Sequence, residues 1–279
     1  MQWSNEQVHW LVKVLHPEKT VASLPGGAAL SEQSRAALLG LDAGVYSAEQ
    51  ARQLYGAKEA ARELLAEPVV RTMVDRLSLR KGAKIVAFGD SHTADPQSWA
   101  VILNEVLAAQ RPADGISIAV SAVSAETTTH GLVRIGDVVA REPDWILFFI
   151  GVNDARTQGS NATKSLVAHE ETARNVAELR RRAAEETKAR RLWITPPAVA
   201  EDSVPRHWAL GRFGVRFRNE DIARVARTLC ETGDSTVDLF SILGAPPPPE
   251  LLMEDGLHLT LAGQKRVALE VLKGWSALR

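Results

Sequence analysis

The 279-residue chain has one cysteine, a formal net charge of −1 and no apolar run as long as a membrane span. A single cysteine, Cys230, excludes an intrachain disulfide, and its place at the end of a predicted helix favours a thiol packed inward. A chain without a basic field is not expected to bind nucleic acid. Without about 20 consecutive apolar residues, the chain is not expected to span a membrane.

The N-terminus also lacks the marks of an export signal. Residues 1–19, "MQWSNEQVHWLVKVLHPEK", place charges within a helical pattern and contain no basic n-region, no clean apolar h-region and no small-residue cleavage site. We therefore expect a cytoplasmic protein.

Sequence patterns for metals and common cofactors are missing as well. The patterns HExxH, GxGxxG, GxxxxGKS and GxxxxGKT do not occur in the chain. Apart from His92 and His258, the histidines have no partners at the spacing of metal ligands or of a catalytic triad. The sequence therefore predicts neither a bound metal nor a cofactor.

Residues 1–80 and residues 81–279 differ in pattern. The first region contains no convincing strand, but Ser4 and Ser47 each stand three residues ahead of a glutamine, the spacing of a capping box, before an apolar-periodic run. We predict a helical N-terminal extension or subdomain, followed by an α/β domain.

From residue 84 onward, short apolar runs alternate with longer helical stretches. The runs are "KIVAFG", "GISIAV", "WILFFIG", "RLWIT" and "STVDLF". Runs that are apolar on consecutive positions suit strands buried on both faces. Helices are predicted over residues 97–110, 127–141, 165–190, 213–231 and 260–275. This alternation predicts a three-layer α/β/α sandwich around a parallel five-stranded sheet.

Polar residues follow the first and third runs, where the strands of an open α/β sheet present their carboxyl ends to ligands. Ser91 lies in "GDSHT", where a turn between a strand and a helix can expose its hydroxyl beside free N–H groups. Asn153 lies in "GVND", and its amide is a suitable donor to an oxyanion. Turn formation and helix capping are alternative roles for both motifs.

A third motif, "DGLH", stands just before the last predicted helix. The spacing of Asp255 and His258 lets a carboxylate bond one imidazole nitrogen while the other nitrogen faces a hydroxyl. A pair of this kind is common by composition, so the order and placement of the three motifs are what point to a nucleophilic serine site.

The segments "FGDSHT", "IGVNDA" and "DGLHLTLAGQ" resemble blocks I, III and V of the SGNH (GDSL) hydrolase superfamily, which comprises esterases and acyl hydrolases with a flavodoxin-like fold. The resemblance extends over about residues 84–275. It implies that Ser91 is the nucleophile, His258 the general base and Asp255 the carboxylate that orients it. It also implies an oxyanion hole made by the Ser91 N–H, the Asn153 amide and a backbone N–H from block II.

Block II departs from the family pattern, because "VSAVSAETTTHG" places Ala125 where the family has a glycine. A backbone donor survives this change, but a positive φ at that position would be strained. Gly131 is an alternative, although it would lie inside the following helix.

Three further residues, His92, Asp154 and Leu257, are candidates for lining the pocket. His92 also neighbours the serine, but adjacent residues on a turn project in different directions, so His258 is the better base. The segment 196–214 is long for a connection and is expected to form a lid or a wall of the acyl pocket.

The expected activity is ester hydrolysis through an acyl-enzyme on a small-molecule substrate with a short acyl chain, with O-acetylated carbohydrate as one candidate. Two alternatives stay open. The same triad would serve an acyltransferase if the pocket excluded water, and Ala125 is compatible with a non-catalytic binding module.

Overall fold

Five parallel strands form the central sheet within residues 3–22, 24 and 26–278, the part of the chain that this computed structural model describes. The strands are β1 (Lys84–Gly89), β2 (Ser117–Ala122), β3 (Trp145–Phe149), β4 (Arg190–Ile194) and β5 (Ser235–Val237). Their order is β2-β1-β3-β4-β5, so the sheet grows in opposite directions from β1. The predicted parallel sheet is confirmed, and each strand lies close to its predicted position.

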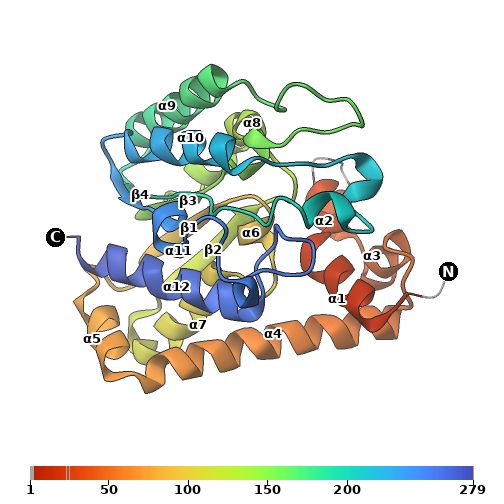
Figure 1. The fold of residues 1–279 in the computed structure, drawn as a ribbon. Helices are drawn as coiled ribbons and strands as arrows, with labels where there is room; N and C mark the ends of the chain where they lie inside the picture. Colours follow the sequence, from red (N-terminus) through yellow and green to blue (C-terminus); the bar gives the residue numbers. More distant parts are fainter. Residues whose placement is uncertain (1–2, 23, 25, 279) are drawn as a thin grey trace.

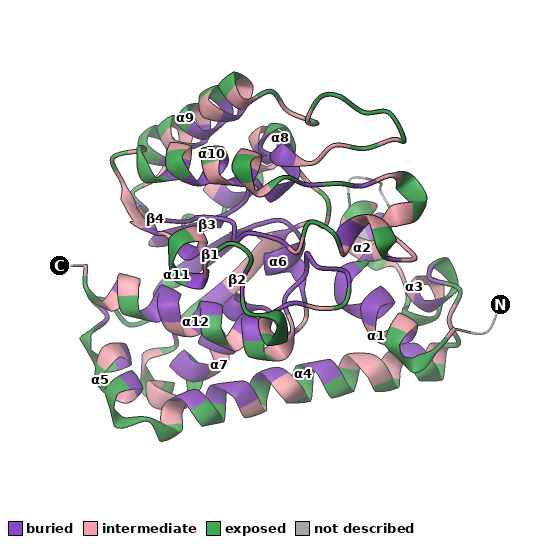
Figure 2. Cartoon of the chain, in the orientation of Figure 1, coloured by how far each residue is buried: buried purple, intermediate pink, exposed green. Residues whose placement is uncertain are grey.

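Helices cover both faces of this sheet (Figure 1). One face carries α4 (Ala43–Ala66), α5 (Pro68–Arg76), α7 (Trp99–Gln110) and α12 (Leu261–Ser276), and the other carries α8 (Thr128–Val139), α9 (His169–Glu186) and α10 (Asn219–Cys230). Alternate residues of β1 serve the two faces, because Ile85 packs with the first group and Val86 with the second. The central strands β1 and β3 are therefore buried along nearly all of their length, whereas the edge strands β2 and β5 are mostly half-buried (Figure 2). The predicted three-layer sandwich is confirmed.

The N-terminal helices occupy two places on this domain. The helices α1 (Asn5–Val14) and α2 (Pro17–Thr20) lie near α6 (Ser91–Ala94), α3 (Glu32–Leu38) lies beyond them against α2 and α4, and α4 runs along the base of the molecule (Figure 1). The expected capping box at Ser4 is present. Leu64 and Val74 share a core with Leu103 of α7. The division of the chain near residue 80 stays a prediction.

Two expectations about single residues are wrong. Helix α4 begins at Ala43, because the Asp42 carboxylate accepts the first free N–H groups, and Ser47 lies inside the helix instead of capping it. Cys230 is exposed, since it is the last residue of α10 and the preceding Leu229 is the one that faces the core.

Two helices also begin later than predicted. Helix α9 starts at His169 and α10 at Asn219. Before α10, residues 211–213 form a separate 3₁₀ turn, which ends at Gly214 with a φ of 65°, a conformation that favours glycine. Among the described residues, no helix combines the length and apolar character needed to cross a membrane.

Candidate active site

Ser91 lies just beyond the carboxyl end of β1 and is the first residue of α6. The carboxylate of Asp90 caps this helix by accepting the N–H of His92 at 3.1 Å. Gly89 is required before the turn, because a Cβ at this position would lie 2.5 Å from the carbonyl oxygen of Phe149. The tight junction directs the Ser91 hydroxyl to the edge of the sheet where β3 also ends.

The structure brings Ser91, His258 and Asp255 together in one hydrogen-bonded series. The Ser91 Oγ lies 3.0 Å from His258 Nε2, and His258 Nδ1 lies 2.6 Å from Asp255 Oδ2. The other carboxylate oxygen accepts the N–H groups of Leu257 and His258 at 2.9 and 2.8 Å, which shapes the turn that carries the imidazole. A neutral imidazole in this arrangement can take a proton from the hydroxyl while the carboxylate orients it.

Trp10 of α1 provides a further contact that the sequence analysis missed. Its indole N–H donates to Asp255 Oδ2 at 2.6 Å, so four N–H groups converge on this buried carboxylate. Burial alone raises the pKa of Asp255, but the charge and hydrogen bonds of His258 and the bond from Trp10 hold this pKa well below its usual range. A tryptophan on an amphipathic helix is typical of a core residue, so its spacing contains no signal of this role.

The turn of residues 123–126 lies beside Gly89 and Asn153. The N–H of Val123 donates to the Gly89 carbonyl at 3.3 Å, and the Asn153 amide donates to the carbonyl of Glu126 at 3.0 Å. In the described part of the chain, the backbone N–H groups of Ser91 and Ala125 have no hydrogen-bond partner. The donors of the expected oxyanion hole therefore belong to neighbouring segments at one edge of the sheet.

Gly131, the alternative backbone donor for the oxyanion hole, already uses its N–H in the first turn of α8. Its N–H donates to the Thr127 carbonyl at 3.1 Å, and a Cβ there would meet the side chains of Phe88, Ile150 and Leu179. Its role is close packing of α8 against the sheet, which leaves Ala125 as the residue beside Asn153.

Comparison with known proteins agrees with this geometry. Residues 87–266, more than half of the chain, match the GDSL-like lipase/acylhydrolase family. The chain belongs to this family. It is accordingly an SGNH-type serine esterase. A comparison with curated proteins found no match.

Solved structures of other hydrolases share the fold of this SGNH esterase. An α/β hydrolase from the metagenome of Lake Arreo, Spain, is 21% identical with a TM-score of 0.55, over 73% of this chain and 99% of that one. An acetylxylan esterase from Geobacillus stearothermophilus is 20% identical with a TM-score of 0.53, over 71% of this chain and 95% of that one. At this level of identity the likeness shows the common fold.

Ala125 of the esterase has a φ of 67°, in the left-handed region that favours glycine. An alanine in this conformation destabilises the folded state by roughly 1–2 kcal/mol. Glycine removes this strain, but it also gives the unfolded chain more conformational freedom, which offsets part of the gain in stability. We expect Ala125→Gly to raise the free energy of unfolding by about 1 kcal/mol and the melting temperature by about 2 °C, measured by calorimetry.

A matched control is Ala48→Gly in the exposed interior of α4. There glycine should lower the free energy of unfolding by about 1 kcal/mol, because alanine is the better helix former. A lower melting temperature for Ala125→Gly would show that the backbone at this turn is not strained.

His92 lies beneath the esterase site and is not placed to act as its base. Its Nδ1 is 3.3 Å from the Asp90 carboxylate and its Nε2 is 3.1 Å from the Leu257 carbonyl oxygen, so both nitrogens face acceptors. Burial lowers the pKa of His92, but the hydrogen bond and charge of Asp90 and the Leu257 carbonyl outweigh it and raise this pKa overall. The buried ring, stacked on Phe149, links the serine turn to the turn that carries His258.

Asp154 and Leu257, the other two residues expected to line the pocket, are buried as well. The Asp154 carboxylate accepts the backbone N–H and the hydroxyl of Thr128 and, at 3.0 Å, the hydroxyl of Thr172. The Leu257 side chain belongs to the core beside α8 and α9. Asp154 thus joins two helix N-termini and also borders a small cavity beside Thr172 and Asp221. The role of the three side chains in lining the substrate pocket stays a prediction.

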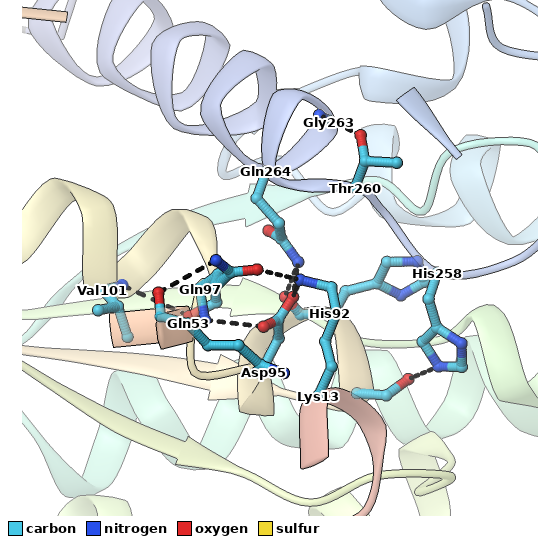
Figure 3. Close-up of polar contacts among 12 residues, drawn as sticks. Lys13, Gln53, His92, Asp95, Gln97, Val101, His258, Thr260, Gly263 and Gln264 are labelled. Carbon is cyan, nitrogen blue, oxygen red and sulfur yellow. Dashed lines mark hydrogen bonds and ion pairs between the residues drawn. The ribbon is translucent and has the colours of Figure 1, made fainter. Parts of the chain in front are cut away.

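A second polar contact, made by Lys13, joins α1 to the site. Lys13, only 1% exposed, places its Nζ 2.6 Å from Asp95 Oδ2 and 3.1 Å from Gln97 Oε1. Gln264 of α12 donates to the same Asp95 oxygen at 2.9 Å (Figure 3). Since a buried charge requires its partner, α1 is an integral part of this hydrolase site.

The segment 196–214, expected as a lid or pocket wall, lies next to α1. Trp208 packs against Trp10, with ring centroids 5.3 Å apart, and Trp10 in turn lies edge-on to His258. Phe213 is 60% exposed. The role of this segment as a lid stays a prediction.

Within the described residues, no three His, Cys, Asp or Glu side chains are grouped as a metal site requires.

Proposed function

We propose that this SGNH esterase hydrolyses short-chain acyl esters through an acyl-enzyme on Ser91. The observation that carries the proposal is the hydrogen-bonded series from the Ser91 hydroxyl through His258 to Asp255. A serine hydroxyl is a weak nucleophile on its own, and an adjacent base oriented by a third group activates it.

The proposed reaction has two halves. His258 Nε2 takes the Ser91 proton as Oγ attacks the acyl carbon, and the same proton then goes to the alcohol oxygen as the ester C–O bond breaks. In the second half His258 takes a proton from water, the resulting hydroxide forms the new bond to the acyl carbon, and Ser91 leaves with its proton restored. Asp255 stabilises the imidazolium in both halves.

Three donors are proposed for the oxyanion: the N–H groups of Ser91 and Ala125 and the side-chain amide of Asn153. One amide hydrogen of Asn153 is used by the Glu126 carbonyl, and the second is available for the ligand. Donors held in advance stabilise the charge that develops on the carbonyl oxygen without reorganising during the reaction.

Burial of the site supports a small acyl group. Ser91 and His258 are only 5% and 6% exposed, so little room surrounds the reacting atoms. The structural likeness to an acetylxylan esterase further supports acetyl as the acyl group and a carbohydrate as the alcohol part.

A series of p-nitrophenyl esters from acetate to octanoate tests this proposal. We expect kcat/KM to be highest for the shortest chains and to fall with chain length, because longer chains lack space beside Ser91. The products should be free acids even when alcohols or sugars are added. Acyl esters of the added alcohol would instead show an acyltransferase.

Covalent labelling provides the second test. A fluorophosphonate should modify Ser91 stoichiometrically, as located by mass spectrometry, because only an activated serine reacts with this probe. Folded protein that neither reacts with the probe nor hydrolyses any ester of the series would contradict the proposal and favour a binding module.

A further inference from the structure

His16, which precedes α2, is a buried histidine that the proposed mechanism does not use. It is 6% exposed, and its Nδ1 lies 3.3 Å from the hydroxyl oxygen of Ser124. Ser124 directly precedes Ala125, whose N–H is one of the proposed oxyanion donors. His16 therefore borders the turn on which the ester carbonyl is proposed to bind.

The hydrogen bonds around Ser124 determine which nitrogen of His16 carries the proton. The Ser124 hydroxyl donates its single hydrogen to the carbonyl oxygen of Val14. It must therefore accept from His16, so Nδ1 is protonated and Nε2 presents a lone pair. Because the two ring nitrogens point in different directions, this lone pair points away from Ser124.

The lone pair of His16 Nε2 is buried, and it has no hydrogen-bond partner among the described residues. Burial lowers the pKa of His16 well below its usual value, and the nearby charges of Lys19, His258 and Lys13 lower it further. The ring stays neutral near pH 7, so Nε2 can only accept a hydrogen bond. A buried acceptor left without a donor is costly, which indicates a place for a ligand donor.

Two lysines of the same segment place His16 next to the serine helix. Lys13 bonds Asp95, and the Lys19 Nζ donates to the Ala94 carbonyl at the end of α6 at 2.8 Å. His16 lies between Lys13 and Lys19 in the sequence, and its ring contacts the hydroxyl of Ser124. It is thus held at the junction between α6 and the turn of residues 123–126, where the substrate of the proposed reaction is expected to lie.

We propose that His16 Nε2 accepts a hydrogen bond from a free hydroxyl on the alcohol part of the ester bound at Ser91. The substrate class is then a partly acylated polyol or carbohydrate, whose neighbouring hydroxyl is recognised by this nitrogen. The proposal rests on the proposed function. It assigns a specificity role to residue 16, which lies outside the part of the chain that matches the family.

A pair of esters that differ in one donor tests the proposal in the wild-type protein. Ethylene glycol monoacetate has a free hydroxyl, and 2-methoxyethyl acetate carries a methyl ether instead. We expect kcat/KM to be about tenfold higher for the hydroxyl ester, the size expected of one neutral hydrogen bond. Equal values for the two esters would overturn the proposal while leaving ester hydrolysis intact.

Two substitutions separate the nitrogens of His16. Asn places its amide near the position of Nδ1 and Gln near that of Nε2. His16→Asn should therefore lose most of the tenfold preference, and His16→Gln should keep most of it. The opposite result, with the preference lost only in His16→Gln, would assign His16 a structural role through Ser124.

Calorimetry on both variants establishes that they are folded, and the wild-type comparison stands even if one of them is not. Failure of the proposed function looks different from failure of this inference. In the first case neither ester is hydrolysed by the wild type and no fluorophosphonate label appears. In the second case both esters are hydrolysed at equal kcat/KM.

Discussion

Replacement of Ser91 by alanine is expected to reduce kcat for p-nitrophenyl acetate by a factor on the order of 10⁵–10⁶. The substitution removes the oxygen that forms the acyl-enzyme, and His258 then has no hydroxyl to deprotonate. The smaller side chain fits the same space at the start of α6, and the N-cap contact from Asp90 is independent of the serine oxygen. The loss should appear in kcat, measured at saturating ester, and the fluorophosphonate label should disappear.

Ser276→Ala is a matched control on the last turn of α12, where the hydroxyl donates only to the Lys273 carbonyl. We expect it to retain wild-type kcat. Residual activity of Ser91→Ala within tenfold of the wild type, in protein with a normal melting temperature, would contradict the assignment of Ser91 as nucleophile.

Asp255→Asn is expected to reduce kcat by a factor on the order of 10⁴. Four N–H groups converge on the carboxylate, from Trp10, Leu257 and, twice, His258. An amide has one acceptor oxygen, and its NH₂ group repels the donors that it meets. Donation from this NH₂ to His258 Nδ1 would move the imidazole proton to Nε2, where it blocks proton transfer from Ser91.

The pH dependence of stability provides an independent measurement for Asp255. Its pKa is held below the unfolded value of about 3.9. A depressed pKa contributes stability that is present above the unfolded pKa and is lost as the pH falls toward the folded pKa. The stability of the wild type relative to Asp255→Asn should therefore decline as the pH falls below about 4, measured by urea unfolding. A difference that does not change with pH would contradict the low pKa.

Trp10→Phe is a milder change than Asp255→Asn at the same hydrogen-bonded carboxylate. It keeps the ring in the cluster with Trp208 but removes one of the four donors to the carboxylate. We expect a smaller loss of kcat than in Asp255→Asn, because the His258 tautomer is unchanged. A full loss of kcat would instead show that α1 is needed for folding of the site, and calorimetry separates the two results.

The sheet and the order of its strands along the chain were predictable from local pattern. Runs such as "WILFFIG" are apolar on successive positions, which only a strand covered on both faces accommodates. The same pattern located Ser91 and Asn153, since the residue that follows a buried strand emerges at the carboxyl edge of the sheet. The pair Asp255 and His258 was predictable because its contact is local, within one turn of the chain.

Errors at the sequence level arose where several local solutions were equally good. Ser47 has the spacing of a helix cap, but Asp42 provides a cap four residues after Leu38 ends α3, so the helix begins earlier. Cys230 is the last residue of α10 and faces solvent, whereas its neighbour Leu229, one position earlier on the helix, faces the core. Helix periodicity locates a face to within about a residue, which is too coarse to place a terminal side chain.

Only the tertiary structure decided how the N-terminal helices take part in the site. Trp10 meets Asp255 and His16 meets Ser124 across more than a hundred residues of chain, and no spacing in the sequence marks such a pair. The positive φ of Ala125 likewise occurs in a turn whose ends are hydrogen-bonded to Gly89 and Asn153, residues distant from it in the sequence. Periodicity and turn chemistry are local properties that act within a few residues, whereas these contacts exist only once the sheet has brought distant segments to one edge.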